Sequence, residues 1–520
     1  MKTKQLFFCS LTGLALLTAS CSSNDEALNG GDGTTSEGKT YAQIAISVAN
    51  SATTRTTTPG NTGDEAYGDD AEYTVNDLTV VLANENDIAM QVITPTLKTA
   101  TNTDDDDKLV RVTEPFKCTP GTYKVYVLAN YKNSQDALTP IIKGSTDMKA
   151  EFGITNIAKL STTDEFFMTN VSAPEGQEIK EAATGKELND AGKDETKEGA
   201  ATNLNILTVN VERAVSKVTF DNTDNQSFYV MVGDNKIATA TLEGASLINL
   251  NKKMYLVKEG RTATNKPAGV TDKWPYPMDP NYSQTSIDEA YCKANFEQRI
   301  ATNFPAPSAT KFYCPENTMA DAAQLNGQTT GVVYKVKYAP EAAYYTELAA
   351  ENGTDSYSKM YEKVLALGET EIAPTITNTI FTKADNEDGT FYSYNGYVFR
   401  SLAGARLYKA IATNTDGEAA TVNGAFKTEN NDGIQTYAEG YCYYTAWIKH
   451  NPGGTTMQQD KYGVVRNFWY ELKVNSIKKL GYSKPTYEKP TDPDDKAEAS
   501  IQVQVKIKKW RLVKQNVDLE

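Results

Sequence analysis

Histidine is almost missing from this chain: among 520 residues there is one, His450. A histidine-based catalytic triad and a histidine-rich metal site are therefore nearly excluded. No GxGxxG opens a βα unit, and GxxxxGK[ST], HExxH and GxSxG with a partner histidine are missing too. Carboxylate pairs abound, but 67 acidic residues produce such pairs by chance. We therefore expect no catalytic residues, no metal ion and no cofactor, which means that the protein is not an enzyme.

Cysteine is sparse and lacks the CxxC spacing of metal sites. Two of the six cysteines fall in the first 21 residues, and the others are Cys118, Cys292, Cys314 and Cys442. Cys292 and Cys314 could form a disulfide, but structural thiols fit equally well, and the sequence does not decide the pairing.

Positive charge is in short supply, because 52 basic residues face 67 acidic ones and the net charge is -15. Such a chain would be repelled by phosphates, so we expect no nucleic-acid partner. With 39% hydrophobic and 23% charged residues, it is neither disordered throughout nor a multi-span membrane protein. The 30 tyrosines and the frequent threonine and valine favour β-structure. The length suits two to four domains.

The N-terminus has the features of an export signal. Lys2 and Lys4 precede an apolar run over residues 6–17, which is too short to span a bilayer stably. Small residues before Cys21 resemble a bacterial lipobox, although Thr18 stands where leucine is usual. We predict a signal peptide over 1–20 and lipidation of Cys21, with an ordinary signal peptide as the alternative. The polar residues 22–40 are typical of a flexible tether.

A short strand follows, in which Ile44, Ile46 and Val48 alternate with smaller residues. Behind it, Arg55 is the single basic residue of a threonine-rich stretch. The segment could be an edge strand and a loop. Alternatively, an arginine among small residues suits cleavage by a trypsin-like protease between Arg55 and Thr56.

Further strands are expected where apolar residues alternate. They are residues 75–82, 88–93, 109–112, 121–131, 204–220, 238–250 and 331–338, with a domain junction near residues 212–214. The acidic residues 101–108 could hold Ca²⁺ but lack the EF-hand glycine and closing glutamate, so a solvated loop is the default. Residues 171–203 are predicted as a surface loop, and residues 357–367 as a short helix.

Residues 441–477 contain two strand-like segments around an NPGG turn, and we predict that they pair antiparallel. Phe468, Trp469 and Tyr470 could stack on sugars, but such aromatics are more often core residues in a β-protein.

The last twenty residues read as a strand with one apolar face, formed by Ile501, Val503, Val505 and Ile507. A proline- and charge-rich stretch over 483–500 would tether this strand loosely. The apolar parity changes at Lys508–Lys509, which predicts a β-bulge near Lys509. The apolar residues beyond this point are Trp510, Leu512, Val513, Val517 and Leu519.

The export signal, the strand before Arg55, the VERAVSKV junction and the C-terminal sequence together resemble the FimA/Mfa-type major fimbrial subunits of Bacteroidales, which form type V pili. The Mfa branch is the nearer match. The most specific parts are residues 448–470 and 510–519.

This resemblance implies an all-β fold with two transthyretin-like β-sandwich domains in tandem and a C-terminal donor strand. The domains would span 56–210 and 211–482, after a propeptide over 21–55 and before the linker and donor strand over 483–520. It also implies a lipoprotein precursor of the outer membrane, anchored through Cys21. An Arg-specific protease would cut after Arg55 and remove the first strand.

The donor strand of another subunit would then fill the vacated position, through Ile501, Val503, Val505, Ile507, Trp510, Leu512, Val517 and Leu519. The implied product is a homopolymer, with anchor and tip subunits as further partners, in a fimbria on the cell surface that supports adhesion, colonisation and biofilm formation. The alternatives are a tip or accessory adhesin, a lipid-anchored anchor subunit, and more remotely a surface glycan-binding lipoprotein.

Overall fold

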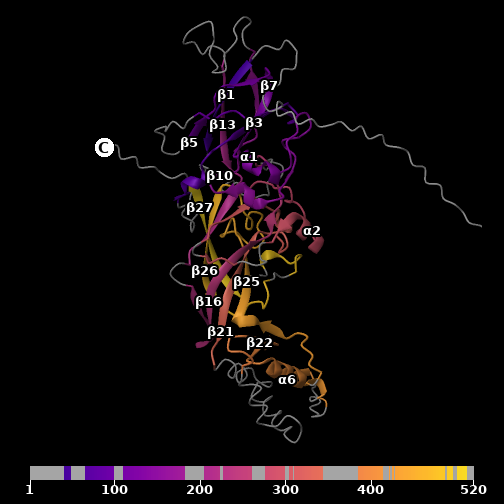
Figure 1. The fold of residues 1–520 in the computed structure, drawn as a ribbon. Helices are drawn as coiled ribbons and strands as arrows, with labels where there is room; N and C mark the ends of the chain where they lie inside the picture. The colour runs from indigo at the N-terminus through magenta and orange to yellow at the C-terminus, as the bar shows by residue number, and fades with distance from the viewer. Residues whose placement is uncertain are drawn as a thin grey trace, which may run out of the picture.

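The computed structural model describes most of the chain between residues 40 and 511. The described residues are 40–48, 65–98, 109–181, 204–222, 226–259, 276–298, 304–307, 310–342, 384–413, 421, 424–426, 428–485, 489–495 and 500–511. Strands predominate in an elongated body, with β1 and β7 near one end and α6 near the other (Figure 1). The expectation of a mainly β-protein is therefore confirmed. Among the described residues, no helix has the length and apolar character needed to cross a membrane.

The first half of the described chain builds a nine-stranded sheet. Its strands are β1 (Thr40–Val48), β3 (Leu78–Ala83), β4 (Ala89–Ile93), β5 (Leu109–Val112), β6 (Phe116–Cys118), β7 (Gly121–Ala129), β11 (Met168–Asn170), β12 (Gly176–Ile179) and β13 (Leu204–Arg213). The order is β4-β3-β7-β11-β13-β1-β5, while β12 pairs with β7 and β6 pairs with β1. Every residue of β3 is buried, as is expected for a strand covered on both faces.

The two ends of this sheet are joined to each other. Leu97, just after β4, forms an antiparallel bridge with Thr113, just after β5. The Lys98 amide donates to the Val112 carbonyl at 2.8 Å, and the Glu114 amide donates to the Thr96 carbonyl at 2.7 Å. The sheet therefore closes around an apolar interior, and β1 lies inside the closed arrangement, away from any free edge.

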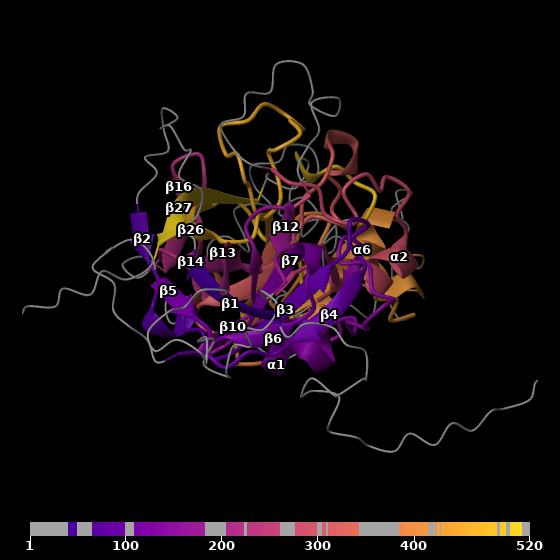
Figure 2. The ribbon, with the colours of Figure 1, turned by 90° about the horizontal axis from the view of Figure 1, so that it is seen from above.

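Two further sheets form the second half. One has the order β2-β27-β26-β14-β20 and the other the order β15-β16-β21-β25. The bounds are β2 (Glu65–Tyr67), β14 (Val215–Phe220), β15 (Ser227–Val232), β16 (Asn235–Ile248), β20 (Phe312–Pro315), β21 (Gly331–Pro340), β25 (Tyr441–Trp447), β26 (Phe468–Ile477) and β27 (Ile501–Arg511). Ala214 alone separates β13 from β14, so the chain passes from the first sheet to the second within one residue. Seen from above, β2 and β27 lie at one side of the molecule (Figure 2).

The predicted antiparallel pairing within residues 441–477 is wrong. β25 pairs with β21, whereas β26 lies between β14 and β27 in the other sheet. The intervening turn therefore connects two sheets. Alternation identified both strands correctly but carried no information on their partners, because the long-range neighbours decide strand pairing.

A small lobe is inserted between β21 and β25. It contains β22 (Phe391–Tyr394), β23 (Tyr397–Phe399), β24 (Gln435–Tyr437) and α6 (Leu402–Thr413). Adjacent residues of β22 face opposite ways: Phe391 belongs to the main core, whereas Tyr392 packs in a separate cluster with Leu407 and Tyr408 of α6. Sequence analysis missed α6, although its buried residues recur at helical spacing. The predicted helix over 357–367 lies outside the described residues.

The remaining elements are short. They are α1 (Tyr131–Ser134), α2 (Glu289–Asn295), β8 (Phe152–Gly153), β9 (Ser161–Thr162), β10 (Glu165–Phe166), β17 (Leu250–Asn251), β18 (Lys253–Met254), β19 (Phe296–Glu297) and the 3-10 helices η2 (Asp70–Glu72), η3 (Gln135–Ala137), η4 (Ile157–Leu160), η7 (Asp321–Ala323) and η9 (Ala438–Gly440). β8 pairs with β18, which links the two halves. Cys118, Cys292, Cys314 and Cys442 are all free thiols, so the disulfide alternative does not hold.

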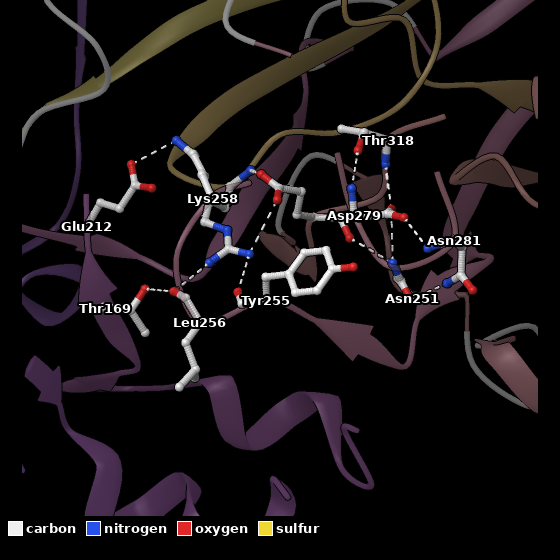
Figure 3. A network of polar contacts seen from close by, with 11 residues as sticks. Thr169, Glu212, Asn251, Tyr255, Leu256, Lys258, Asp279, Asn281 and Thr318 are labelled. Atoms are coloured by element: carbon white, nitrogen blue, oxygen red, sulfur yellow. Dashed lines mark hydrogen bonds and ion pairs between the residues drawn. The ribbon is translucent and has the colours of Figure 1, made fainter. Parts of the chain in front are cut away.

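A buried polar network connects the two halves (Figure 3). From the first sheet, Thr169 donates to the Leu256 carbonyl, and Glu212 lies 2.8 Å from the Lys258 ammonium. From the second half, Arg466 donates to the carbonyls of Leu256 and Tyr255, at 3.1 and 2.7 Å. Burial raises the pKa of Glu212, against the opposing effect of Lys258. These bonds satisfy carbonyls that would otherwise be buried without donors.

Asp279 is the buried carboxylate at the other end of this network (Figure 3). It accepts hydrogen bonds from the Asn281 amide at 2.6 Å, the Thr318 amide at 2.7 Å and the Asn251 side chain at 3.0 Å. Desolvation nevertheless dominates and raises the pKa of Asp279 to about 8.

The segment that follows residues 49–64 is fixed to the second half. Glu72, in η2, lies 2.7 Å from the ammonium of Lys217, and both side chains are at most 2% exposed. The Tyr313 hydroxyl also donates to Glu72, at 2.5 Å. Lys217 lies 3.8 Å from the centre of the Trp469 ring, and burial lowers its pKa. The ion pair therefore ties residues 65–73 to β14, β20 and β26.

We expect Lys217→Met to lower the free energy of unfolding by about 3–5 kcal/mol, because it leaves the Glu72 carboxylate buried without its cation. The matched control is Lys473→Met, since Lys473 pairs with Asp221 at 3.4 Å while both side chains are 48% exposed. This change should cost about 0–1 kcal/mol. Urea unfolding measures both, and equal losses would show that burial does not strengthen the Glu72–Lys217 pair.

The second prediction concerns Asp279 and pH. A folded-state pKa of about 8, above the ordinary 3.8, means that stability from this group is complete below about pH 4 and falls as the pH rises toward 8. Asp279→Asn mimics the protonated acid. The variant should match the wild type near pH 4 and exceed its unfolding free energy by about 4–6 kcal/mol at pH 8. An equal difference at both pH values would show that the three N–H donors keep Asp279 ionised despite burial.

Candidate functional site

The strand β1 is enclosed on both edges. On one edge it runs parallel to β13, with paired positions from Tyr41↔Leu204 to Val48↔Val211. On the other edge it runs antiparallel to β6 over Thr40–Ala42 and to β5 over Ala45–Val48. An N-terminal strand would ordinarily be added at the edge of a sheet. The edge-strand alternative is therefore wrong, and the strand prediction for this segment is confirmed.

The side chains of β1 complete the apolar interior. Ile44, Ile46 and Val48 are fully buried and belong to the main core. Burial of an aliphatic side chain of this size stabilises the fold by about 1.5–3 kcal/mol. Removal of β1 would therefore leave an apolar channel with unpaired backbone groups on two neighbouring strands.

Two polar side chains add hydrogen bonds to the backbone ladders of β1, and one of them, Thr113, lies between β5 and β6 where the ladder on that edge is interrupted. The Thr113 hydroxyl accepts from the Ile44 amide at 3.1 Å, while the Thr113 amide donates to the Ile44 carbonyl at 2.9 Å. The side chain of Asn205 donates to the Tyr41 carbonyl at 3.0 Å. Sequence analysis missed Thr113 and Asn205, because neither lies near β1 in the chain and no motif marks them.

The thiol nearest to β1 is that of Cys118, at the end of β6 and opposite Thr40. Burial raises the pKa of Cys118 to about 12, so the thiol stays protonated at neutral pH. A protonated thiol is a poor nucleophile, which makes this cysteine a packing residue.

The C-terminal strand β27 pairs within its own chain. It runs antiparallel to β26 from Ile501↔Ile477 to Lys509↔Phe468. Ile501 and Val505 are buried, and Val503 packs partly buried against the same core. Ile507 and Trp510 lie within the strand. The predicted donor residues Leu512, Val517 and Leu519 lie outside the described residues, as do Cys21, Arg55, Thr56 and the acidic segment 101–108.

The edge of β27 that faces away from β26 is paired over only a few residues among the described strands. β2 pairs with it in parallel, from Glu65↔Lys509 to Tyr67↔Arg511, and this is its only other ladder there. Along Ile501–Lys508, the backbone of β27 is therefore paired with β26 and with no other described strand. The contrast with β1, which is paired on both edges, is the main geometric feature of the two terminal strands.

Two expectations about this region are wrong. The register between β26 and β27 is regular from Val503 to Lys509, so no bulge lies in this part of β27. The one irregularity of the pairing falls between Val474 and Ser476 of β26. The stretch before β27 is also not a loose tether over its described part. The Asn326 amide donates to the Asp492 carbonyl at 2.9 Å, and Asp494 is buried.

Solved structures with a similar arrangement come from Bacteroidales. A candidate cell adhesion protein of Parabacteroides distasonis ATCC 8503 is 14% identical, with a TM-score of 0.39 over 91% of this chain and 100% of that chain. The fimbrilin FimA of Porphyromonas gingivalis W83 is 13% identical, with a TM-score of 0.37 over 91% and 99%. The tip fimbrial protein Mfa3 of Porphyromonas gingivalis, with C-terminal truncation, is 11% identical, with a TM-score of 0.30 over 90% and 100%.

The family comparison is independent of these structures. No curated protein matches the chain. Residues 42–256 match the family described as "Major fimbrial subunit protein (FimA)". Residues 435–516 match the family described as "Major fimbrial subunit protein type IV, Fimbrillin, C-terminal". The first match includes most of β1 together with β13, and the second includes β26 and β27. The resemblance stated from the sequence is thus confirmed, and the chain belongs to the FimA-type family of major fimbrial subunits.

Proposed function

We propose that this protein is a shaft subunit that polymerises by protease-triggered exchange of its terminal strands. Cleavage between Arg55 and Thr56 releases β1, and the C-terminal strand of another copy, Ile501 to Leu519, takes its place. The precursor is anchored in the outer membrane through a lipid on Cys21. The product is a surface fimbria that supports adhesion, colonisation and biofilm formation.

The observation that carries this proposal is the position of β1. It is a terminal segment that is paired on both edges inside a closed sheet. Most interior strands cannot be removed without cutting the chain twice. A single cut in residues 49–64 is enough to free β1, and Arg55 lies in that segment.

The residue pattern of β27 fits the position of β1. Apolar residues recur at every second position in both strands, as Ala42, Ile44, Ile46 and Val48 in β1 and as Ile501, Val503, Val505 and Ile507 in β27. An incoming strand of this pattern would supply main-chain hydrogen bonds together with side chains of similar volume.

Pairing on two edges provides the driving force. Over Ile501–Lys508, β27 has one ladder in its own chain, whereas a strand at the β1 position has one on each edge. Each added hydrogen bond is worth about 0.5–1.5 kcal/mol net. Moving β27 out of its own sheet and into an empty β1 position therefore exchanges one ladder for two. While β1 occupies that position, the exchange gains nothing.

Donation of this kind is head-to-tail, because the donor strand and the acceptor position are different surfaces. Such contacts generate open filaments unless the rotation closes a ring. A tip adhesin would need no donor strand, and an anchor subunit would need no processing arginine; the chain carries candidates for both, which favours a shaft role. The proposed domains remain residues 56–210 and 211–482, as two transthyretin-like sandwiches.

The direct test treats the purified precursor with an Arg-specific protease. We expect a new N-terminus at Thr56 and a ladder of polymers on electrophoresis without boiling. Arg55→Ala should remain monomeric, whereas the matched change Arg406→Ala, in α6 of the separate lobe, leaves Arg55 available and should still polymerise. A polymer ladder from uncleaved Arg55→Ala would contradict the proposed trigger.

A second prediction separates donor from acceptor. Val505→Asp places a charge on the apolar face of β27, so the processed variant should accept a strand but donate poorly. Added to processed wild type in equal amounts, it should shorten the polymers. Gln504→Asp is the matched control, because Gln504 is exposed, and it should leave their length unchanged. Polymers of full length with Val505→Asp would exclude β27 as the donor.

A further inference from the structure

A cluster of buried polar side chains lies where residues 316–330 meet the segment that precedes β27. The Asp494 amide donates to the Gln324 carbonyl at 3.2 Å, and the Gly327 amide donates to the Pro490 carbonyl at 2.9 Å. Residues 325–329 form one tight turn, in which the amides of Gln328 and Thr329 both donate to the Leu325 carbonyl. These bonds bring Asp494 alongside the turn that carries Gln324, Asn326 and Gln328.

The side chains of this region hold more acceptors than donors. Gln324, Asn326, Gln328 and Asp494 are all fully buried. In each, a side-chain oxygen has no hydrogen-bond partner, whereas the only unpartnered nitrogen among them is that of Asn326. Exchanging the oxygen and nitrogen positions of the side-chain amides does not remove this excess of acceptors. The nitrogens of Gln324 and Gln328 already donate to the carbonyls of Gln458 and Ala323, and a flip would break these bonds. Asn317 adds a further unpartnered buried oxygen nearby, since its side-chain nitrogen donates to the Gln328 carbonyl at 2.7 Å.

Among the described residues, no cationic side chain lies within bonding distance of the Asp494 carboxylate. One of its oxygens accepts from the Thr329 hydroxyl, and the other is unpartnered. The neighbouring ammonium of Lys461 instead lies 2.6 Å from Asp495, which also accepts from Tyr462. A buried carboxylate that lacks a counter-charge is costly unless it binds a proton or a cation.

We propose that Asp494 and the side-chain oxygens of Gln324, Asn326 and Gln328 form a binding site for a hard cation, with Ca²⁺ as the ion of matching chemistry. Ca²⁺ takes six to eight oxygen ligands, including carboxylates and amide carbonyls, in flexible geometry. A single carboxylate among neutral amide oxygens gives weak affinity, of the order expected of extracellular modules, with Kd of about 0.1–1 mM. The site lies within one chain and does not depend on strand exchange.

Bound water is the competing occupant, and the composition of the cluster argues against water alone. Water supplies as many acceptors as donors, so it suits a pocket with unpartnered groups of both kinds. Here the unpartnered atoms are nearly all oxygens, and one belongs to an acid. In the proposed site a cation would displace the proton that burial favours on Asp494, whose pKa is raised well above its ordinary value, and would be bound by the carboxylate and the amide oxygens together.

The test uses the full chain stripped with EDTA. Addition of about 5 mM CaCl2 should raise the Tm by about 2 °C or more, and the same ionic strength of NaCl should not. Terbium luminescence sensitised by nearby aromatic residues should saturate and be displaced by Ca²⁺. Asp494→Asn should remove both responses. Asp321→Asn is the matched control, because Asp321 lies exposed in the same segment, and it should keep them.

A second variant guards against misfolding of Asp494→Asn. Both side-chain polar atoms of Asn326 are unpartnered, so Asn326→Leu breaks no hydrogen bond within the protein. It should fold as the wild type does in EDTA and bind Ca²⁺ about tenfold more weakly or worse. A wild-type Tm that is the same in EDTA and in CaCl2, or an unchanged response in Asp494→Asn, would overturn the site and leave water as its occupant.

Discussion

Pairing of β1 on both edges is the constraint on which the arrangement depends. The strand is the first described element of the chain, yet it lies between β13 and the β5–β6 edge, and its apolar residues fill the interior of a sheet whose ends are joined. The sheet is complete only while some strand occupies this position. Without a strand at this position, apolar side chains and backbone groups of β13, β5 and β6 would be left without partners. This is why the proposed function begins from β1 and the segment that follows it.

The buried polar network between the two halves holds the body together independently of β1. Glu212 lies on β13, the neighbour of β1, and Thr169 lies on β11, which pairs with β13; they contact Lys258 and Leu256 from the second half (Figure 3). The Glu72–Lys217 ion pair fixes the residues that follow Arg55 in sequence. Loss of β1 would therefore remove the strand alone and keep the rest of the body in register. Burial makes these ion pairs expensive to break, so they contribute more to a defined geometry than to net stability.

The alternation of apolar and polar residues predicted where strands lie, but it did not predict which strands pair with each other. Alternation located β1, β5 and the β13–β14 junction within a few residues, because a strand with one buried face must repeat every second residue. It could not show that β25 and β26 belong to different sheets, or that Thr113 closes the edge of β1, since these facts depend on contacts between distant segments. Asp494 stood in a stretch whose composition indicates a solvated linker. Only the packing against residues 324–327 revealed it as a core residue.

The lobe of β22, β23, β24 and α6 has a consequence for how such chains diversify. Its own apolar cluster is separate from the main core, and it enters and leaves the body between β21 and β25, far from β1 in the elongated molecule (Figure 1). Phe391, Val398 and Tyr437 attach the lobe to the main core, whereas the buried residues of α6 pack in the separate cluster. The α6 side of the lobe can therefore change in sequence without altering the packing around β1, so tolerance to substitution differs between the two ends of the same chain.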